Sequence, residues 1–379
     1  MNRSVFIQEG IATIAPAITP LSGNIFSQQS NSIASERNQS ASGKEASEMK
    51  PIVDEQDIIN TYSTAEQFSC KKYTEYQKLI KENPSFGYKK AAKLLGVKQG
   101  RTRWWHTKGV KRAIPLPLKV VEKLKSAGLL PFDENHKDAK IIFNMLGVLF
   151  GDGGIDLRYN TVAFISSDKM DIDLWHADLL RLFPFAKGKT QIVEGGEFGH
   201  SYNVRCYDRA VVRFFAAIGA PVGDKVTINY SLPKWLANSS EQLCIEFLDG
   251  YLAAEVSVVR WRPDSLGNKR FTDFSVGISK IESLENEHRE YLKSVEGLLD
   301  SVGVPTTGNI HKNYSAGNHR KDGLVTANYR IFIRTTFHRV LFFNQLFQLR
   351  YAQGKKERFG KVIAGAIEEK EAKKLQKQG

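Results

Sequence analysis

The sequence predicts a mixed α/β fold of the α+β kind, in which a duplicated α-β-β-α-β-β-α unit follows an all-α helix-turn-helix domain. Two observations predict the duplication. An apolar helix that ends in an acidic residue occurs at 140–155 and again at 243–258, and the same order of strands and helices follows each copy. A third observation, a compact basic block at residues 71–131, predicts the separate helical domain.

Length and composition predict several folded units in a reducing compartment. A chain of 379 residues with 41% hydrophobic residues can fill two or three cores. Its 3 cysteines are scattered and form no CxxC pair, which argues against a disulfide framework or a zinc finger. No apolar run approaches the roughly 18 residues of a membrane span. We therefore expect an intracellular protein of the cytoplasm or nucleoid, with an organelle as the alternative, and no membrane partner.

The two ends of the chain differ from its middle. Residues 1–55 are rich in Ser, Asn, Gln and Ala and lack hydrophobic periodicity, so we expect a disordered leader there. Residues 350–379 hold 9 basic and 4 acidic residues, and we expect a basic helical tail whose charge pairs face solvent.

The net charge of +13 is concentrated in the block at residues 71–131, which holds 16 Lys and Arg against 3 Glu. Such a block is typical of a nucleic-acid binder, because each Lys or Arg placed on a phosphate releases a counterion. The alternative is a basic surface that only contacts solvent.

Within this block, the pattern of residues 86–107 resembles a helix-turn-helix. Gly96 ends a first short helix, and a second helix follows at about 98–107. The second helix would serve as the recognition helix, although Thr102 stands where such motifs usually bury Val or Ile. An ordinary basic helical hairpin would show the same pattern. The residues expected to face phosphates and base edges are Lys98, Gln99, Arg101, Arg103 and Lys108.

The two apolar helices share one internal register. Gly147 precedes Asp152 by five residues, and Gly250 precedes Glu255 by five. Each helix also has a small residue four positions after its glycine, which is Gly151 in the first and Ala254 in the second. Small residues at i and i+4 lie on one face of a helix and let two helices approach closely. We therefore expect the two helices to pack together through Gly147, Gly151, Gly250 and Ala254.

That packing would place Asp152 and Glu255 side by side at the ends of their helices. Two neighbouring carboxylates repel each other, and the negative end of each helix dipole adds to the repulsion. A divalent cation with oxygen ligands compensates such a pair. The sequence therefore predicts a site for Mg²⁺, with Mn²⁺ as a substitute, and hydrolysis of phosphodiester bonds.

The segments after each acid repeat in order, which predicts one unit at 138–222 and a second at 223–348. After Asp152 we expect strands at 155–158 and 161–166, a helix at 171–183, strands at 189–193 and 202–207, and a helix at 209–218. After Glu255 we expect strands at 257–262 and 271–279, a helix at 284–302, strands at 308–313 and 325–333, and a helix at 336–347.

These motifs, the duplicated order and the linking segment Gly223-Asp224-Lys225-Val226 to Leu232-Pro233 resemble the LAGLIDADG homing endonucleases over residues 138–348. The preceding helical motif is similar to one fused to some members. The resemblance implies two antiparallel saddle sheets in the DNA major groove, with Asp152 and Glu255 as metal-binding acids. By loose alignment it also implies catalytic roles for Lys169 and Lys280. Val256 departs from the family's usual glycine and would resist a positive φ, which makes an impaired second site conceivable.

Several side chains alternate along the expected strands and match positions that read base edges in the family. An ordinary antiparallel sheet would place the same residues on its solvated face, so that alternative stays open. The residues expected to contact DNA in this way are Tyr202, Arg205, Tyr207, Arg260, Arg262, Arg330 and Arg334.

Together these features predict a site-specific double-strand DNA homing endonuclease that acts as a monomer on a long asymmetric target. Its cleavage would initiate mobility of an intron or of a free-standing element. Two alternatives use the same scaffold. A non-cutting DNA-binding regulator would have no need of two acids facing phosphate, and an intron maturase would bind intron RNA instead of DNA.

Overall fold

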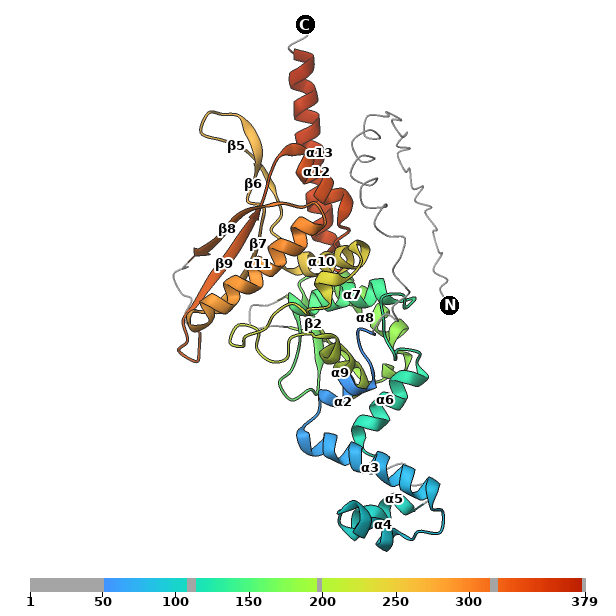
Figure 1. Cartoon of the computed structure of the whole chain (residues 1–379). Helices are drawn as coiled ribbons and strands as arrows, with labels where there is room; N and C mark the ends of the chain where they lie inside the picture. Colours follow the sequence, from blue (N-terminus) through green and yellow to red (C-terminus); the bar gives the residue numbers. More distant parts are fainter. Residues whose placement is uncertain (1–50, 108–113, 196–199, 314–319, 377–379) are drawn as a thin grey trace, which may run out of the picture. The chain divides into compact units, whose positions relative to one another are not determined.

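A computed structural model describes residues 51–107, 114–195, 200–313 and 320–376, and Figure 1 shows the order of their elements along the chain. The expected mixed α/β fold with antiparallel sheets is confirmed. Residues 1–50, which make up most of the expected leader, lie outside the described residues, as does Lys108.

Five helices precede the first acidic motif. Val53 forms a β-bridge with Phe132, and Asp54 caps the first helix. Residues 51–55 are therefore structured, and the expected leader is too long at its end. The five helices are α2 (Glu55–Asn60), α3 (Thr64–Glu82), α4 (Tyr88–Leu95), α5 (Gln99–His106) and α6 (Leu116–Ser126).

These helices belong to two cores, and the block at 71–131 is not one packing unit. Tyr76, Ala91 and Trp105 form a small core shared by α3, α4 and α5. In contrast, Val120 and Leu124 of α6 join the main core of the molecule. Gly96 ends α4 with a φ of 65°, a left-handed conformation that glycine adopts without strain.

The first half of the main body, residues 139–222, contains one four-stranded antiparallel sheet with strand order β1-β2-β4-β3. One face of this sheet is buried, because Val162 and Phe164 of β2 and Val204 and Cys206 of β4 are all inaccessible. Its elements are α7 (Ala139–Phe150), β1 (Gly153–Ile155), β2 (Val162–Ser166), α8 (Lys169–Leu182), a 3-10 turn (Pro184–Ala186), β3 (Thr190–Glu194), β4 (Tyr202–Cys206) and α9 (Arg209–Ile218).

The second half, residues 241–346, contains a three-stranded sheet with order β7-β9-β8 and a separate hairpin, β5-β6. Its elements are α10 (Glu241–Glu255), β5 (Arg260–Pro263), β6 (Lys269–Thr272), β7 (Ser275–Ile281), α11 (Glu285–Ser301), β8 (Thr306–Asn313), β9 (Thr326–Ile333) and α12 (Phe337–Leu346). Further 3-10 turns lie at Leu236–Asn238 and Glu282–Leu284.

The second sheet therefore differs from a continuous saddle. The bridge between Val256 and Val276 has the same register as the pair Arg260 and Thr272 of the β5-β6 hairpin. The β5-β6 hairpin and the start of β7 therefore belong to one long hairpin. It is interrupted at Asp273, whose φ of 61° is unusual for a residue other than glycine. The hydroxyl of Ser257 bonds to backbone groups on the opposite strand there and replaces part of the ladder.

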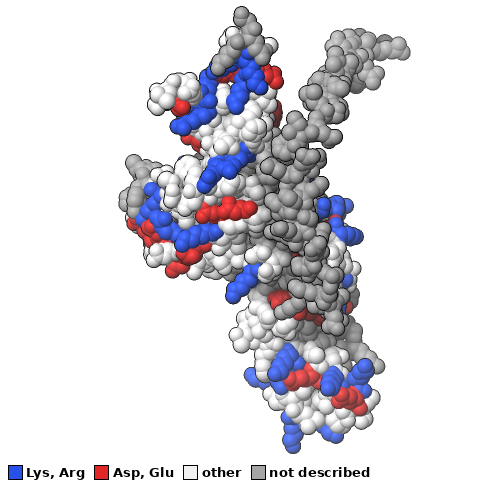
Figure 2. Space-filling model, turned by 45° about the horizontal axis from the view of Figure 1, so that its top comes forward, with Lys and Arg blue, Asp and Glu red and all other residues white. Residues whose placement is uncertain are grey.

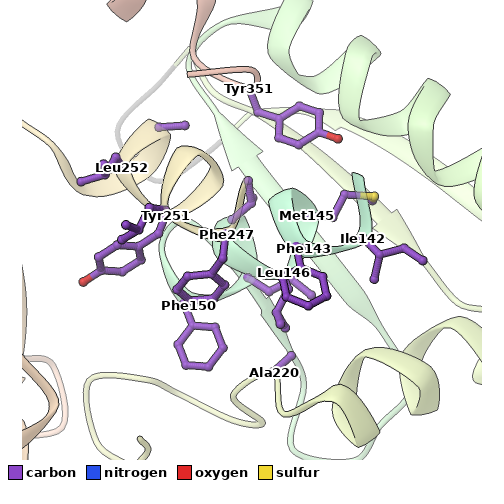
Figure 3. Close-up of a cluster of buried hydrophobic side chains, with 14 of the residues drawn as sticks. Ile142, Phe143, Met145, Leu146, Phe150, Ala220, Phe247, Tyr251, Leu252 and Tyr351 are labelled. Atoms are coloured by element: carbon purple, nitrogen blue, oxygen red, sulfur yellow. The ribbon is translucent and has the colours of Figure 1, made fainter. Parts of the chain in front are cut away.

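The main core lies where α7 and α10 pack on each other (Figures 1 and 3). Figure 3 shows Phe143, Leu146 and Phe150 of α7 packed together with Phe247 and Tyr251 of α10. The rings of Phe150 and Phe247 are 5.4 Å apart in an edge-to-face arrangement, which is favourable for aromatic pairs. The two motif helices thus form the centre of the molecule.

The C-terminal segment is part of the body and not a solvated tail. Helix α13 (Gln353–Gln376) buries Phe359, Ile363 and Ala366 completely or almost completely. The ring of Phe359 lies 5.7 Å from Phe274 of the second half and 5.6 Å from Phe343 of α12. The expected charge pairs facing solvent are found in part, since Glu357 and Lys361 form an exposed pair, but the opposite side of the same helix is buried in the core. No helix in the described ranges is long and apolar enough to cross a membrane.

Candidate active site

The site begins with two acids at the ends of the packed helices. Asp152 follows Gly151, the C-terminal cap of α7, and Glu255 is the last residue of α10. A methyl group built on Gly151 would overlap the side chain of Ala254 and lie 3.5 Å from a carboxylate oxygen of Glu255. The residues before each acid therefore touch, and the two acids are neighbours.

The electrostatics of this pair are unfavourable without a cation. Desolvation raises the pKa of Glu255, and the charge of Asp152 raises it further. Desolvation also raises the pKa of Asp152, although its side chain reaches solvent. Both shifts mean that the site resists carrying two negative charges. Lysines oppose the shifts, and these lysines are the main feature that sequence reasoning missed.

Lys225 caps the end of α7. Its ammonium group donates hydrogen bonds to the carbonyl oxygens of Leu149 at 3.1 Å and Gly153 at 2.6 Å, and to that of Gly151. Carbonyl groups at a helix C-terminus carry partial negative charge and have no partner within the helix. Burial lowers the pKa of Lys225, whereas Glu255 and Asp152 act to raise it.

Lys355 caps the end of α10 in the same way. Its ammonium group donates to the carbonyl oxygens of Ala253 at 2.6 Å and Ala254 at 2.9 Å. Burial lowers the pKa of Lys355, and Asp152 and Glu255 oppose that shift. Each motif helix therefore ends in one acid and carries one lysine on its last carbonyl groups. A signal for Lys225 existed in the linking segment that resembles the family, but residues around Lys355 gave none.

The structure does not bring the two lysines expected from the resemblance to the acids. Lys169 is exposed on α8 and pairs with Asp173 one turn away at 2.5 Å. Lys280 is 2% exposed and donates to the carbonyl oxygens of Lys225 at 2.6 Å and of Ile228. Neither acid is among the hydrogen-bond partners of these lysines, and their assignment as catalytic groups stays a prediction. Lys280 instead supports the backbone that carries Lys225.

Two hollows meet at Lys355 and Arg358 of α13. The first, of about 410 Å³, is lined by Asp152, Ser167, Asp168 and Ala254 among others. The second, of about 830 Å³, lies on the second half and has a basic lining. Its cationic side chains come from the hairpin, from β9 and from α13: Arg260, Arg262, Arg330, Lys355, Arg358 and Lys361. The structure thus brings together three of the residues expected to contact DNA.

The remaining strand residues fall in different places. Arg205 and Tyr207 are exposed on the outward face of the first sheet. Tyr202 alternates with the buried residues Val204 and Cys206 and packs partly buried against the core, and its expected contact with DNA stays a prediction. Arg334 is exposed but bonds the carbonyl oxygen of Thr306 at 2.8 Å, and it does not line the basic hollow of the second half.

The helical hairpin exposes most of its expected contacts. Lys98, Gln99, Arg101 and Arg103 are all exposed, whereas Thr102 is completely buried and its hydroxyl bonds the carbonyl oxygen of Gln99. That bond explains how a threonine occupies a position that usually takes an apolar residue. Sequence reasoning missed Trp104, which is 59% exposed beside these cations. In Figure 2, the part of the molecule that holds α3 to α5, at the bottom of the view, exposes Lys and Arg with a few acidic side chains among them.

The two acids fit a magnesium ion better than a zinc ion. No group of three or more His, Cys, Asp or Glu gathers as a metal cage within the described ranges. Mg²⁺ is commonly held by one or two carboxylates, with water and phosphate oxygens as its other ligands. The raised pKa values of Asp152 and Glu255 are what such an ion would reverse.

Val256 gives no structural reason for a weakened second site. Its φ of −79° and ψ of 134° are extended, and it pairs with Val276 across the hairpin. No positive φ is needed after Glu255, so a β-branched residue is accommodated without strain.

Comparison with known proteins yields distant similarities. No family model matches the chain. A stretch of 203 residues, 49% of this chain, is 27% identical to 20% of the tRNA-splicing ligase RtcB of Methanocaldococcus jannaschii. The RtcB ligase of Methanopyrus kandleri is 25% identical over 200 residues, which are 50% of this chain and 20% of that protein. The chain therefore matches only about a fifth of the length of these relatives.

Among solved structures, the homing endonuclease I-DmoI in complex with DNA and Ca is similar over 56% of this chain and 92% of its own, with 20% identity and a TM-score of 0.36. The N-terminal LAGLIDADG domain of DUF199/WhiA covers 62% of this chain and 89% of its own, with 12% identity and a TM-score of 0.32.

Proposed function

We propose that the chain is a magnesium-dependent homing endonuclease that cuts both strands of a long, asymmetric DNA site. One observation carries the proposal. Asp152 and Glu255 lie side by side at the ends of two packed helices, and each helix end also carries a lysine, Lys225 or Lys355. Two acids that can hold a metal ion, with two lysines beside them, suit hydrolysis of a negatively charged phosphodiester.

The order of elements supports a duplicated enzyme. In the first half a motif helix is followed by two strands, a helix, two strands and a final helix. The second half has the same order when β6 and β7 are taken as one interrupted arm of the long hairpin that contains β5. Two such units in one chain supply two half-sites without a partner subunit. We propose that the protein acts as a monomer, because each half contributes one acid and one hydrolytic centre.

The residues of the site have separate roles in the proposed reaction. The carboxylates of Asp152 and Glu255 would hold Mg²⁺, which supplies a charge for the phosphate oxygens and an activated water. The ammonium groups of Lys225 and Lys355 limit the repulsion between the acids. They would also stabilise the negative charge that builds up on the phosphate during hydrolysis. Arg260, Arg262 and Arg330 would hold the DNA backbone and base edges in the basic hollow of the second half.

The helical hairpin formed by α4 and α5 would provide a second DNA contact. The side chains of Arg101 and Arg103 reach solvent from α5, and Gln99 at its start can reach a base edge. This contact would lengthen the target beyond the part covered by the two halves. A non-cutting regulator or an intron RNA maturase would keep this surface and the hollows, and would differ in activity on DNA.

Cleavage of supercoiled plasmid tests the proposal. The plasmid carries the genomic sequences that flank this gene, joined without it, and is incubated with Mg²⁺. We expect linear product from the wild type, and none from Asp152→Asn or Glu255→Gln or after addition of EDTA. Glu290→Gln, which changes an exposed glutamate of α11 that pairs with Lys293, is the matched control and should cut normally.

Other outcomes separate the alternatives. Tight binding of the plasmid without cleavage in Mg²⁺ or Mn²⁺ would refute the endonuclease and favour the regulator. Preferential binding of the intron transcript, with splicing activity, would favour the maturase. The ligase activity named for the archaeal relatives is not part of this proposal, because only a fifth of their length is matched.

A further inference from the structure

A short strap, residues 349–355, returns from the second half to the first and carries Lys355 to the acids. It begins at the motif helix α10, where the buried carboxylate of Asp249 accepts hydrogen bonds from the backbone N–H groups of Leu349 at 2.7 Å and Arg350 at 2.9 Å. The side chain of Asn144 on α7 donates to the same carboxylate at 3.0 Å. The strap is therefore fixed where the two motif helices meet.

The next residues of the strap are held by the first half. Asp178 of α8 accepts hydrogen bonds from the guanidinium of Arg350 at 2.9 Å and from the hydroxyl of Tyr351 at 2.8 Å. Asp171, seven residues earlier on the same helix, accepts the backbone N–H of Gln353 at 3.0 Å. Residues seven apart lie on one face of a helix, so both acids point at the strap.

Burial of these two carboxylates costs free energy, and they accept most of their hydrogen bonds from the strap. Asp171 and Asp178 are 4% and 5% exposed. A buried carboxylate is tolerated only when its oxygens accept strong hydrogen bonds. Besides the strap, Asp171 accepts a hydrogen bond from Ser166, and Asp178 lies 3.8 Å from Arg181. Asp178 does not line the hollow at Asp152 and acts on Lys355 through the strap, whereas Asp171 lines that hollow and also attracts the Lys355 ammonium directly.

The other lysine, Lys225, is held by residues of the second half. Lys225 follows the first half in the chain and caps its motif helix α7, but Lys280 of the second half donates to its carbonyl oxygen at 2.6 Å. The buried Lys280 ammonium also lies 4.2 Å from the ring of Tyr230, which follows in the same linking segment. Beside Lys225, Asp224 pairs with Arg320 of the second half at 2.7 Å.

We infer that each half positions the lysine that serves the other half's motif helix, with Asp171 and Asp178 positioning Lys355, and Lys280 positioning Lys225. The inference rests on the proposed function for its consequence in catalysis. Each lysine caps a different motif helix, so loss of one set of positioning residues would slow the cutting of one DNA strand more than the other. Displacement of a catalytic group by about 1 Å can lower a rate by about a hundredfold.

The first test measures the lysines directly and needs no activity. The full-length protein is treated with formaldehyde and cyanoborohydride, and methylation of each lysine is followed by mass spectrometry. In Asp178→Asn, the methylation rate of Lys355 should rise about tenfold, as expected when a charge-assisted hydrogen bond is lost, and that of Lys225 should not change. In Lys280→Met the pattern should be reversed. Equal changes at both lysines, or none, would overturn the inference.

Matched controls change exposed residues of the same charge. Asp173→Asn changes an exposed acid on α8 that pairs with Lys169, and Lys293→Met changes an exposed lysine that pairs with Glu290. Neither should alter the methylation of Lys225 or Lys355. If Asp178→Asn does not fold, Tyr351→Phe removes a single hydrogen bond to Asp178, keeps the ring packed 6.2 Å from Phe164, and should give a smaller rise at Lys355 alone.

The second test follows each strand of the plasmid target with its own label. Asp178→Asn should accumulate plasmid nicked in one strand, with a loss of about tenfold or more in the rate for the other strand, and Lys280→Met should spare the strand that Asp178→Asn slows. Equal slowing of both strands by both variants would contradict the inference. If the wild type cuts no DNA, the proposed function fails, and the methylation pattern alone decides whether the lysines are positioned in this way.

Discussion

At the scale of single residues, Gly147 and Gly250 set the distance between the two motif helices. A methyl group on Gly147 would overlap the carbonyl oxygen of Phe247, and one on Gly250 would overlap that of Asn144. In both cases the obstacle is backbone, which cannot rotate away as a side chain can. The closeness of Asp152 and Glu255 therefore depends on the absence of a side chain at both glycines.

Gly250→Ala should lower the free energy of unfolding by about 1–3 kcal/mol or more, because the helices must separate to admit the methyl group. Urea denaturation measures the change. Gly297→Ala is the matched control, since Gly297 also lies within a helix, α11, and nothing lies within 4 Å of an added methyl group. That variant should gain roughly 0.5–1 kcal/mol, as alanine stabilises helices. Equal stability of Gly250→Ala and wild type would show that the helices do not meet at this glycine.

At the scale of elements, α13 is both a part of the core and a part of the site. Lys355 and Arg358 of its first turns line the hollows. On its buried side, Phe359 and Ile363 pack into the core of the second half. Its last described turn, residues 371–376, is entirely exposed. The first turns of the helix are therefore packed in the core, and its end is exposed to solvent.

Two truncations should separate these parts of the helix. Removal of residues 349–379 exposes the surface under Tyr351 and Phe359, and should lower the melting temperature by at least about 10 °C or abolish cooperative unfolding. Removal of residues 371–379 should change the melting temperature by no more than about 2 °C, because surface changes rarely exceed about 0.5 kcal/mol. Calorimetry measures both. Equal melting temperatures for the two truncations would contradict the packing of α13.

At the scale of the whole molecule, positive charge is divided between separate surfaces. One is the exposed side of α5, with Arg101 and Arg103, and the other is the basic hollow of the second half. If both contact DNA phosphates, each contributes to the salt dependence of binding, because every neutralised phosphate releases a counterion. Loss of one surface should then reduce the slope without affecting hydrolysis.

The double variant Arg101→Ala/Arg103→Ala should bind the target more weakly and reduce the slope of log K against log salt concentration by about 2, close to 0.9 for each lost contact. Fluorescence anisotropy at several salt concentrations measures the slope. Lys78→Ala/Lys81→Ala, on the neighbouring helix α3, is the control with the same change in charge. A slope that falls equally in both variants would show a general effect of net charge and no contact through α5.

The sequence by itself determined the elements and the acidic pair. Hydrophobic periodicity locates α7 and α10, and the shared spacing from Gly147 to Asp152 and from Gly250 to Glu255 predicts which faces meet. These features are local, because a helix places residues four apart on one face whatever surrounds it. The same reasoning located α9 at its observed bounds, Arg209–Ile218.

Tertiary structure alone decided which cations reach the acids and what the C-terminal segment does. Lys169 and Lys280 were chosen by position after each motif, but Lys225 and Lys355 occupy the helix ends, 74 residues from Gly151 and 101 from Ala254 in the chain. Tyr202 shows the same limit, since a shift of one residue in a strand turns a side chain from one face to the other. Long-range packing chooses among many lysines of similar local context, and the sequence carried a signal of that choice for Lys225 in its linking segment but none for Lys355.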